Sequence, residues 1–101
     1  MQTIGILTVN TVNELYNNAL TQFMNIQIAV NESKLTKQQA VTMLRNIVNI
    51  TNVGFKSARR MAFGDMKWNE KVDQDYETEF KKLYQQMQEY MQTELNPTMS
   101  L

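Results

Sequence analysis

The chain has 101 residues, with ten basic and ten acidic side chains that give a formal net charge of zero at pH 7. This length predicts one domain with a single core, and the neutral balance favours neither nucleic acid nor a cationic partner. Because cysteine and histidine are both absent, disulfides, thiolate chemistry, the usual zinc sites and the commonest general base are excluded. No apolar run reaches the length of about eighteen residues that a membrane-spanning helix needs, so we expect no membrane span.

Residues 1–10 are expected to form an N-terminal arm. Gly5 interrupts a short apolar stretch, and no second strand candidate follows that could complete a sheet. The apolar residues of this stretch are Ile4, Ile6, Leu7 and Val9. We expect an extended arm or a frayed helix end that lies on the rest of the domain. The alternative is an arm that docks on a neighbouring subunit.

Residues 11–32 are predicted to form the first helix. Thr11 and Glu14 have the spacing of a capping box, in which each side chain satisfies a free backbone N–H. Apolar residues then recur at steps of three and four: Val12, Tyr16, Ala19, Phe23, Ile26 and Val30, widened by Leu15, Leu20, Met24 and Ile28. Such a face is broader than one helix contact needs, so we expect it to be buried between two neighbours or against a partner.

Residues 36–63 are predicted to form the central helix, capped by Thr36 with Gln39 as the reciprocal partner. Its apolar stripe consists of Ala40, Leu44, Ile47, Thr51, Gly54, Ala58 and Met61, flanked by Val41, Val48, Phe55 and Ala62. Gly54 costs a helix about 1 kcal/mol relative to alanine, and the close approach of a neighbouring helix would explain its presence. The alternative is a break near Asn52–Gly54 that gives two shorter helices.

Residues 66–95 are predicted to form the third helix, after a C-terminal cap of the central helix at Gly64 and Asp65. The stripe of this helix consists of Trp68, Val72, Tyr76, Phe80, Leu83, Met87 and Tyr90, joined by Tyr84, Met91 and Leu95. Its first half is rich in acidic residues, which the helix dipole favours there. Pro97 is expected to end the helix and to leave residues 97–101 as a C-terminal tail.

These elements predict an all-α fold, namely an up-down three-helix bundle with long helices in a single helical domain over residues 11–96. The short connections make consecutive helices antiparallel. Because the first helix has a wide apolar face and the N-terminal arm has no partner of its own, we expect oligomerisation to complete the fold. A homodimer is the simplest form.

Charge is unevenly distributed along the chain. Residues 34–67 carry seven basic side chains and one acidic one, whereas residues 68–101 carry three basic and seven acidic ones. Five residues form what we call the basic ridge: Arg45, Lys56, Arg59, Arg60 and Lys67. We expect the acidic start of the third helix to neutralise this ridge across the hairpin. The alternative is that the ridge faces the phosphates of a nucleic acid.

No catalytic, metal or cofactor site is predicted. The acidic residues from Asp73 to Glu79 alternate along the chain, which scatters them around a helix instead of converging them on one ion. No phosphate-binding glycine motif and no nucleophile elbow occurs in the sequence. We therefore expect neither an enzyme nor a small-molecule substrate.

The aromatic and methionine side chains of the first and third helices suit either a core or an adaptable contact surface. The interface candidates among the apolar residues are Leu15, Phe23, Ile26, Tyr84, Met87 and Met91. The protein is expected to be a non-enzymatic protein–protein interaction module. We expect it to bind a protein partner and also to form a homo-oligomer. The alternative is a nucleic-acid-binding protein that uses the basic ridge.

The composition adds a hypothesis about origin. Asn and Gln are abundant and there are eight Met, a usage common in AT-rich genomes of low-GC bacteria and their phages. The hypothesis is a small phage or mobile-element protein that assembles into a particle or binds and blocks a host factor. Its expected location is the cytoplasm of the host cell or the virion.

Overall fold

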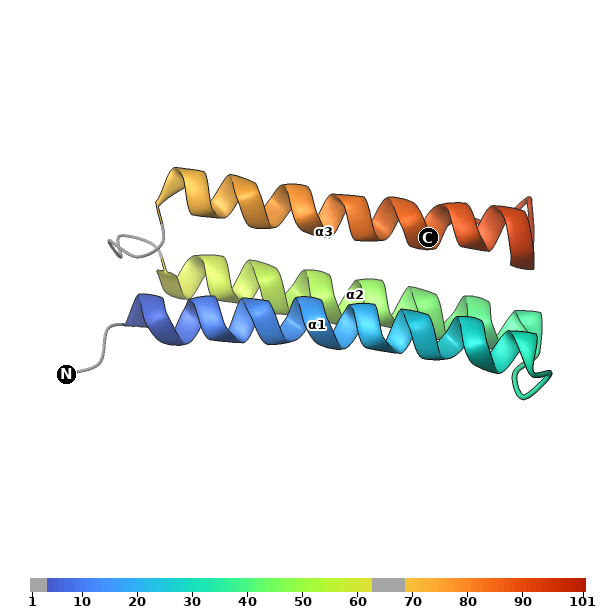
Figure 1. The fold of residues 1–101 in the computed structure, drawn as a ribbon. Helices are drawn as coiled ribbons and strands as arrows, with labels where there is room; N and C mark the ends of the chain where they lie inside the picture. Colours follow the sequence, from blue (N-terminus) through green and yellow to red (C-terminus); the bar gives the residue numbers. More distant parts are fainter. Residues whose placement is uncertain (1–3, 63–68) are drawn as a thin grey trace.

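The computed structural model describes the backbone of residues 4–62 and 69–101, and the side chains from Thr11 onward within those ranges. Its elements are α1 (Ile4–Asn31), α2 (Lys37–Ala62), α3 (Glu70–Tyr90) and a π-helical turn, η1 (Met91–Leu95). No strand occurs within the described ranges, and the expected all-α class is confirmed. The three long helices lie side by side and run alternately in opposite directions (Figure 1), an arrangement that agrees with an up-down bundle.

α1 begins at Ile4, so residues 4–10 form its first turns, which agrees with the expected helix end and not with an extended arm. Thr11 lies inside the helix, so the predicted capping box of Thr11 and Glu14 at the start of the helix is wrong. The physical reason is that nothing between Ile4 and Thr11 stops a helix. Gly5 alone opposes it, at a cost of about 1 kcal/mol, and no proline intervenes. Residues 1–3 lie outside the described ranges. The chain leaves α1 through Ser33, whose positive φ of 60° reverses its direction before α2.

α2 is continuous from Lys37 to Ala62, so the alternative of a break near Gly54 is excluded. Its N-terminus carries the expected capping box. The backbone N–H of Thr36 donates to Gln39 Oε1 at 3.0 Å, and the N–H of Gln39 donates to Thr36 Oγ1 at 3.1 Å. Both otherwise free N–H groups are thereby satisfied, which fixes the start of the helix.

The buried stripe of α2 departs from the predicted one after Thr51. It continues through Ala58 and through Phe55 and Ala62, two of the expected flanking residues, whereas Met61 is exposed. The predicted stripe followed a strict seven-residue repeat, but a straight α-helix turns once in about 3.6 residues and drifts away from that repeat. The position that faces the core therefore moves on by one residue over the last turns of α2.

α3 begins at Glu70, after Asn69, whose side chain accepts a hydrogen bond from the N–H of Val72 at 2.9 Å. The third helix was expected to begin at residue 66, but Asn69 is extended and acts as the N-cap instead. The predicted cap at Gly64 and Asp65, and Trp68 of the predicted stripe, lie outside the described ranges.

The core lies between the three helices and consists of two adjoining clusters. The larger one includes Phe23, Ile26, Leu44, Leu83, Met87, Met91 and Leu95, and the smaller one includes Val12, Phe55, Ala58, Ala62 and Phe80. In the smaller cluster, the Phe80 ring lies 4.9 Å from that of Phe55 and 5.6 Å from that of Tyr16, measured between centroids. Each cluster draws residues from α1, α2 and α3, so no helix packs against only one other.

Candidate interaction surface

The expected interface candidates are mostly used inside the chain. Four of the six, Phe23, Ile26, Met87 and Met91, are buried in the larger core cluster of the single chain. Leu15 and Tyr84 are partly buried and pack against the smaller cluster. The structure therefore brings these residues together, but as core. The buried part of the apolar face of α1 contacts both α2 and α3, whereas Met24 and Ile28, which widen that face, are exposed.

The exposed apolar residues are different ones. Ile50, Val53 and Met61 of α2 are 68%, 67% and 66% exposed. They lie on one side of α2, because Val53 follows Ile50 by nearly one turn and Met61 follows it by eleven residues, about three turns. We call these three residues the exposed apolar face of α2. A second, smaller exposed pair, Met24 and Ile28, belongs to α1.

A groove at the junction of α1 and α2 adjoins this face. It has a volume of about 110 Å³ and is lined by Leu15, Asn18, Ala19, Gln22, Ile47, Ile50 and Thr51. Small side chains such as Ala19 and Thr51 let the two helices approach each other, and Ile50 belongs both to the groove and to the exposed apolar face. The apolar surface of α2 therefore continues into a depression.

The basic ridge is divided by the fold. Arg59 donates to both carboxylate oxygens of Asp73, through Nε at 2.7 Å and through Nη2, and also to Glu77 at 3.3 Å. Its guanidinium lies 4.9 Å from the centroid of the Phe55 ring. The hydrogen bond to Asp73 is the main reason that the pKa of Arg59 is raised above its ordinary value. Arg59 is thus neutralised within the chain, across the hairpin between α2 and α3.

The other ridge residues separate into two groups. Arg45 donates to the backbone carbonyl of Ser100 and is held by the C-terminal tail. Lys56 and Arg60 are exposed and have no carboxylate partner among the described residues. Together with Val53 and Arg59 they line a depression of about 420 Å³. Lys67 lies outside the described ranges.

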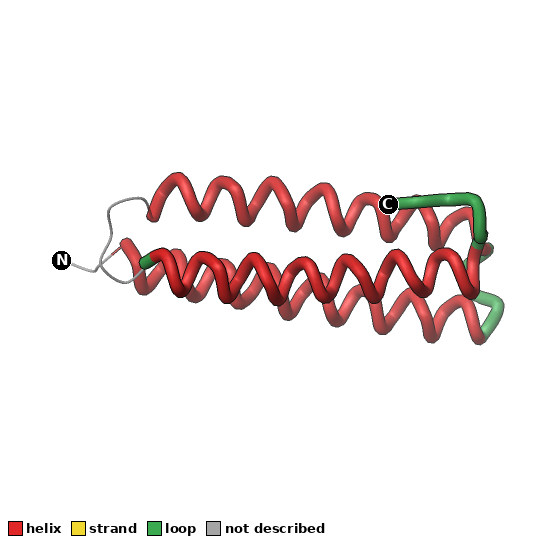
Figure 2. Tube along the Cα trace, turned by 90° about the horizontal axis from the view of Figure 1, so that it is seen from above, coloured by secondary structure: helices red, strands yellow, loops and turns green. Residues whose placement is uncertain are grey.

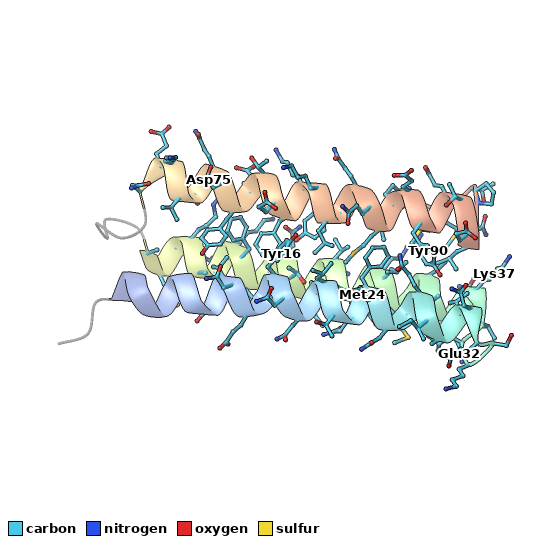
Figure 3. All side chains as sticks on the ribbon, in the orientation of Figure 1. Tyr16, Met24, Glu32, Lys37, Asp75 and Tyr90 are labelled. Carbon is cyan, nitrogen blue, oxygen red and sulfur yellow. The ribbon has the colours of Figure 1, made fainter. Side chains whose placement is uncertain are left out.

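Three tyrosines of α3 have raised pKa values because burial disfavours the charged phenolate. The hydroxyl of Tyr76 donates to Asn13 at 2.8 Å. The hydroxyls of Tyr84 and Tyr90 are buried without a hydrogen-bond partner in the part of the chain that the structure describes. Figure 3 shows Tyr16 and Tyr90 between the helices, whereas Glu32 and Lys37 project near the turn from α1 to α2.

The described residues, 4–62 and 69–101, contain neither a candidate metal site nor a candidate membrane span. No group of three or more Asp or Glu side chains there could hold a metal ion. No helix in these ranges combines the length and the apolar character that crossing a membrane requires.

Sequence reasoning missed Ile50 and Val53 as surface residues. Both lie between the apolar stripe of α2 and its basic side, so they fit neither pattern. Large apolar residues that fall outside the predicted buried stripe were the signal that could have identified them.

Comparison with known proteins gives no match: no family model, no curated protein and no solved structure is similar to this chain.

Proposed function

We propose that the protein is a non-enzymatic interaction module that binds a protein partner through the exposed apolar face of α2. The observation that carries the proposal is the two-thirds exposure of Ile50, Val53 and Met61 on one side of α2, next to the stripe that fills the core. Full burial of a large apolar side chain contributes about 1.5–3 kcal/mol of favourable free energy, relative to leaving the side chain exposed. Three such residues therefore provide enough apolar surface for the centre of a contact.

The charges beside this face restrict the kind of partner. Lys56 and Arg60 flank the exposed apolar face, and α2 contains no acidic residue. Complementary charges speed association and discriminate against wrong partners. A partner surface with apolar residues and flanking carboxylates would fit best.

The proposed partner is another protein, and a second copy of the chain is the alternative. Self-association is supported by the same exposed residues, although α2 of a second copy would bring its own positive charges. The hypothesis of a phage or mobile-element protein, which assembles into a particle or blocks a host factor, still rests on composition alone.

The test is capture of partners from lysate of the native host by the immobilised protein, identified by mass spectrometry. We expect the variant with Ile50→Ser and Val53→Ser to lose the partner that the wild type retains. The matched control, Met24→Ser with Ile28→Ser, removes exposed apolar surface from α1 and should retain it. Light scattering over a range of protein concentrations measures self-association for the same three proteins. Identical partners and identical masses for all three would contradict the proposal.

Nucleic-acid binding through the basic ridge is less well supported. Arg59 is paired with Asp73 and Glu77, and Arg45 is bonded to Ser100, which leaves Lys56 and Arg60 among the described ridge residues. Two free cations make few phosphate contacts. A titration with duplex DNA at several salt concentrations tests this alternative, because phosphate contacts require the affinity to fall steeply with salt.

A further inference from the structure

The C-terminal tail reverses direction directly after η1. The N–H of Met99 donates to the carbonyl of Asn96 at 3.2 Å, which closes a β-turn with Pro97 in its second position. The Asn96 side-chain oxygen accepts from the N–H and the hydroxyl of Thr98, at 3.0 and 2.8 Å. The tail then runs back along the helices (Figure 2).

Two side chains from different helices hold the returning tail by its backbone. On α3, the Gln88 carboxamide donates to the carbonyl of Met99 at 3.4 Å and accepts from the N–H of Leu101 at 2.7 Å. On α2, Arg45 donates to the carbonyl of Ser100 through Nε at 3.2 Å and Nη2 at 2.9 Å. All four bonds are made to main-chain groups of three consecutive residues.

Such bonding recognises an extended chain and not a particular sequence. Gln88 bonds the carbonyl before Ser100 and the N–H after it, as the edge of a neighbouring strand would. Recognition of an added strand works in this way, with main-chain hydrogen bonds for affinity and alternate side chains for specificity.

The alternate side chains of the tail provide the apolar contacts. Met99 and Leu101 are partly buried and pack against the larger core cluster, whereas Ser100 between them is exposed. An open, shallow depression of about 400 Å³ adjoins Leu101 and is lined by Tyr84, Gln85, Gln88, Glu89 and Gln92. The seam between α2 and α3 thus accepts two apolar side chains that are two residues apart and leaves space beside the second.

We propose that this seam is a binding groove for an extended peptide of the form apolar–any–apolar, and that the chain's own tail is its resident occupant. The partner is an extended segment of another chain that replaces the tail, with its backbone bonded by Arg45 and Gln88. This groove lies on a different surface from the exposed apolar face of α2, so the inference is independent of the proposed function.

The first experiment uses the full chain with Met99→Asp and Leu101→Asp, which releases the tail without shortening it. A fluorescent peptide with the sequence of residues 96–101 is titrated, and its anisotropy is measured. We expect saturable binding to the released-tail variant. In the wild type the attached tail competes at an effective concentration on the order of millimolar, so binding of the peptide should be at least about tenfold weaker.

Two controls distinguish binding in the groove from non-specific binding of the peptide. Adding Arg45→Ala and Gln88→Ala to the released-tail variant should abolish binding, because the backbone bonds are lost. A peptide with Asp at both apolar positions should not bind either. A released-tail variant that stays helical and melts cooperatively, but does not bind the peptide, would overturn the inference. Dimers of the wild type that exchange their tails would support it, with the second copy as the source of the segment.

A second measurement works even if the released-tail variant fails to fold. Unlabelled peptide is added in excess to isotope-labelled wild-type protein, and the amide resonance of Leu101 is followed by NMR. Displacement of the tail should move this resonance toward its position in the free peptide. A resonance that does not move at saturating peptide would contradict the inference.

Discussion

Leu15 of α1 lies directly over Gly54 of α2. A Cβ atom at position 54 would come within 2.9 Å of Leu15 Cδ1 and 3.0 Å of Leu15 Cδ2, closer than such atoms normally approach. The missing side chain therefore lets α1 and α2 approach each other at this point. This contact explains why the helix tolerates a residue that costs it about 1 kcal/mol.

Gly54→Leu should lower the free energy of unfolding by about 1–3 kcal/mol, because the added side chain overpacks the contact with Leu15. Chemical denaturation measures this change. In a Leu15→Ala background the contact is relieved, and Gly54→Ala should then stabilise the protein by about 1 kcal/mol through helix propensity. If Gly54→Leu raised the melting temperature of the otherwise wild-type protein, position 54 would have to face solvent.

Phe23→Ala should destabilise the single chain by about 3–5 kcal/mol, because it removes a buried aromatic ring and leaves a cavity. The loss should not depend on protein concentration, since Phe23 is buried within one chain. Met24→Ala is the matched control at the next position, where the side chain is exposed, and it should change stability by less than about 0.5 kcal/mol. A loss that appears only above the concentration of self-association would instead place Phe23 at an interface.

Arg59→Gln should destabilise the protein by on the order of 1 kcal/mol, because it removes the hydrogen bonds to Asp73 and the contact with the Phe55 ring. The side chain is about one-third exposed, which keeps the effect small. Arg60→Gln, one residue on, is the matched control and should leave the free energy of unfolding nearly unchanged. Equal effects of the two substitutions, measured by denaturation at low salt, would argue against a specific role of the Arg59–Asp73 pair.

Stability should fall as the pH rises above 10, the ordinary tyrosine pKa from which those of Tyr76, Tyr84 and Tyr90 are raised. Above that pH the unfolded chain releases phenol protons that the folded chain retains, so the unfolded state gains stability. Tyr84→Phe should make the free energy of unfolding fall less steeply with pH above pH 10. It should also stabilise the protein near pH 7, because it removes a buried hydroxyl without a hydrogen-bond partner. A Tyr84→Phe variant that is less stable at pH 7 would indicate a partner for that hydroxyl.

Local signals in the sequence were sufficient for the helical class, for the Thr36–Gln39 cap and for the approximate course of the three helices. They did not distinguish core from interface, because periodicity marks a residue such as Phe23 as buried without telling which chain buries it. They failed at Met61 because a seven-residue repeat drifts from the true period of the helix.

The contacts of the tail left no local signal at all. Arg45 and Ser100 are 55 residues apart in the sequence, and Gln88 bonds backbone groups that any residue possesses. Contacts of this kind follow from the tertiary arrangement of the helices and the turn at Pro97, so local sequence patterns do not predict them.

The π-helical turn at the end of α3 sets the direction in which the tail departs. The N–H of Asn96 donates to the carbonyl of Met91, five residues back, at 2.7 Å, so η1 contains one residue more than an α-helical turn would. We expect deletion of Thr93 to restore α-helical bonding and to rotate the exit of the chain by about 100° around the helix axis. The tail would then miss Arg45. A single-residue insertion or deletion in this turn would therefore determine whether the seam binds the tail of its own chain or stays accessible to a segment of another chain.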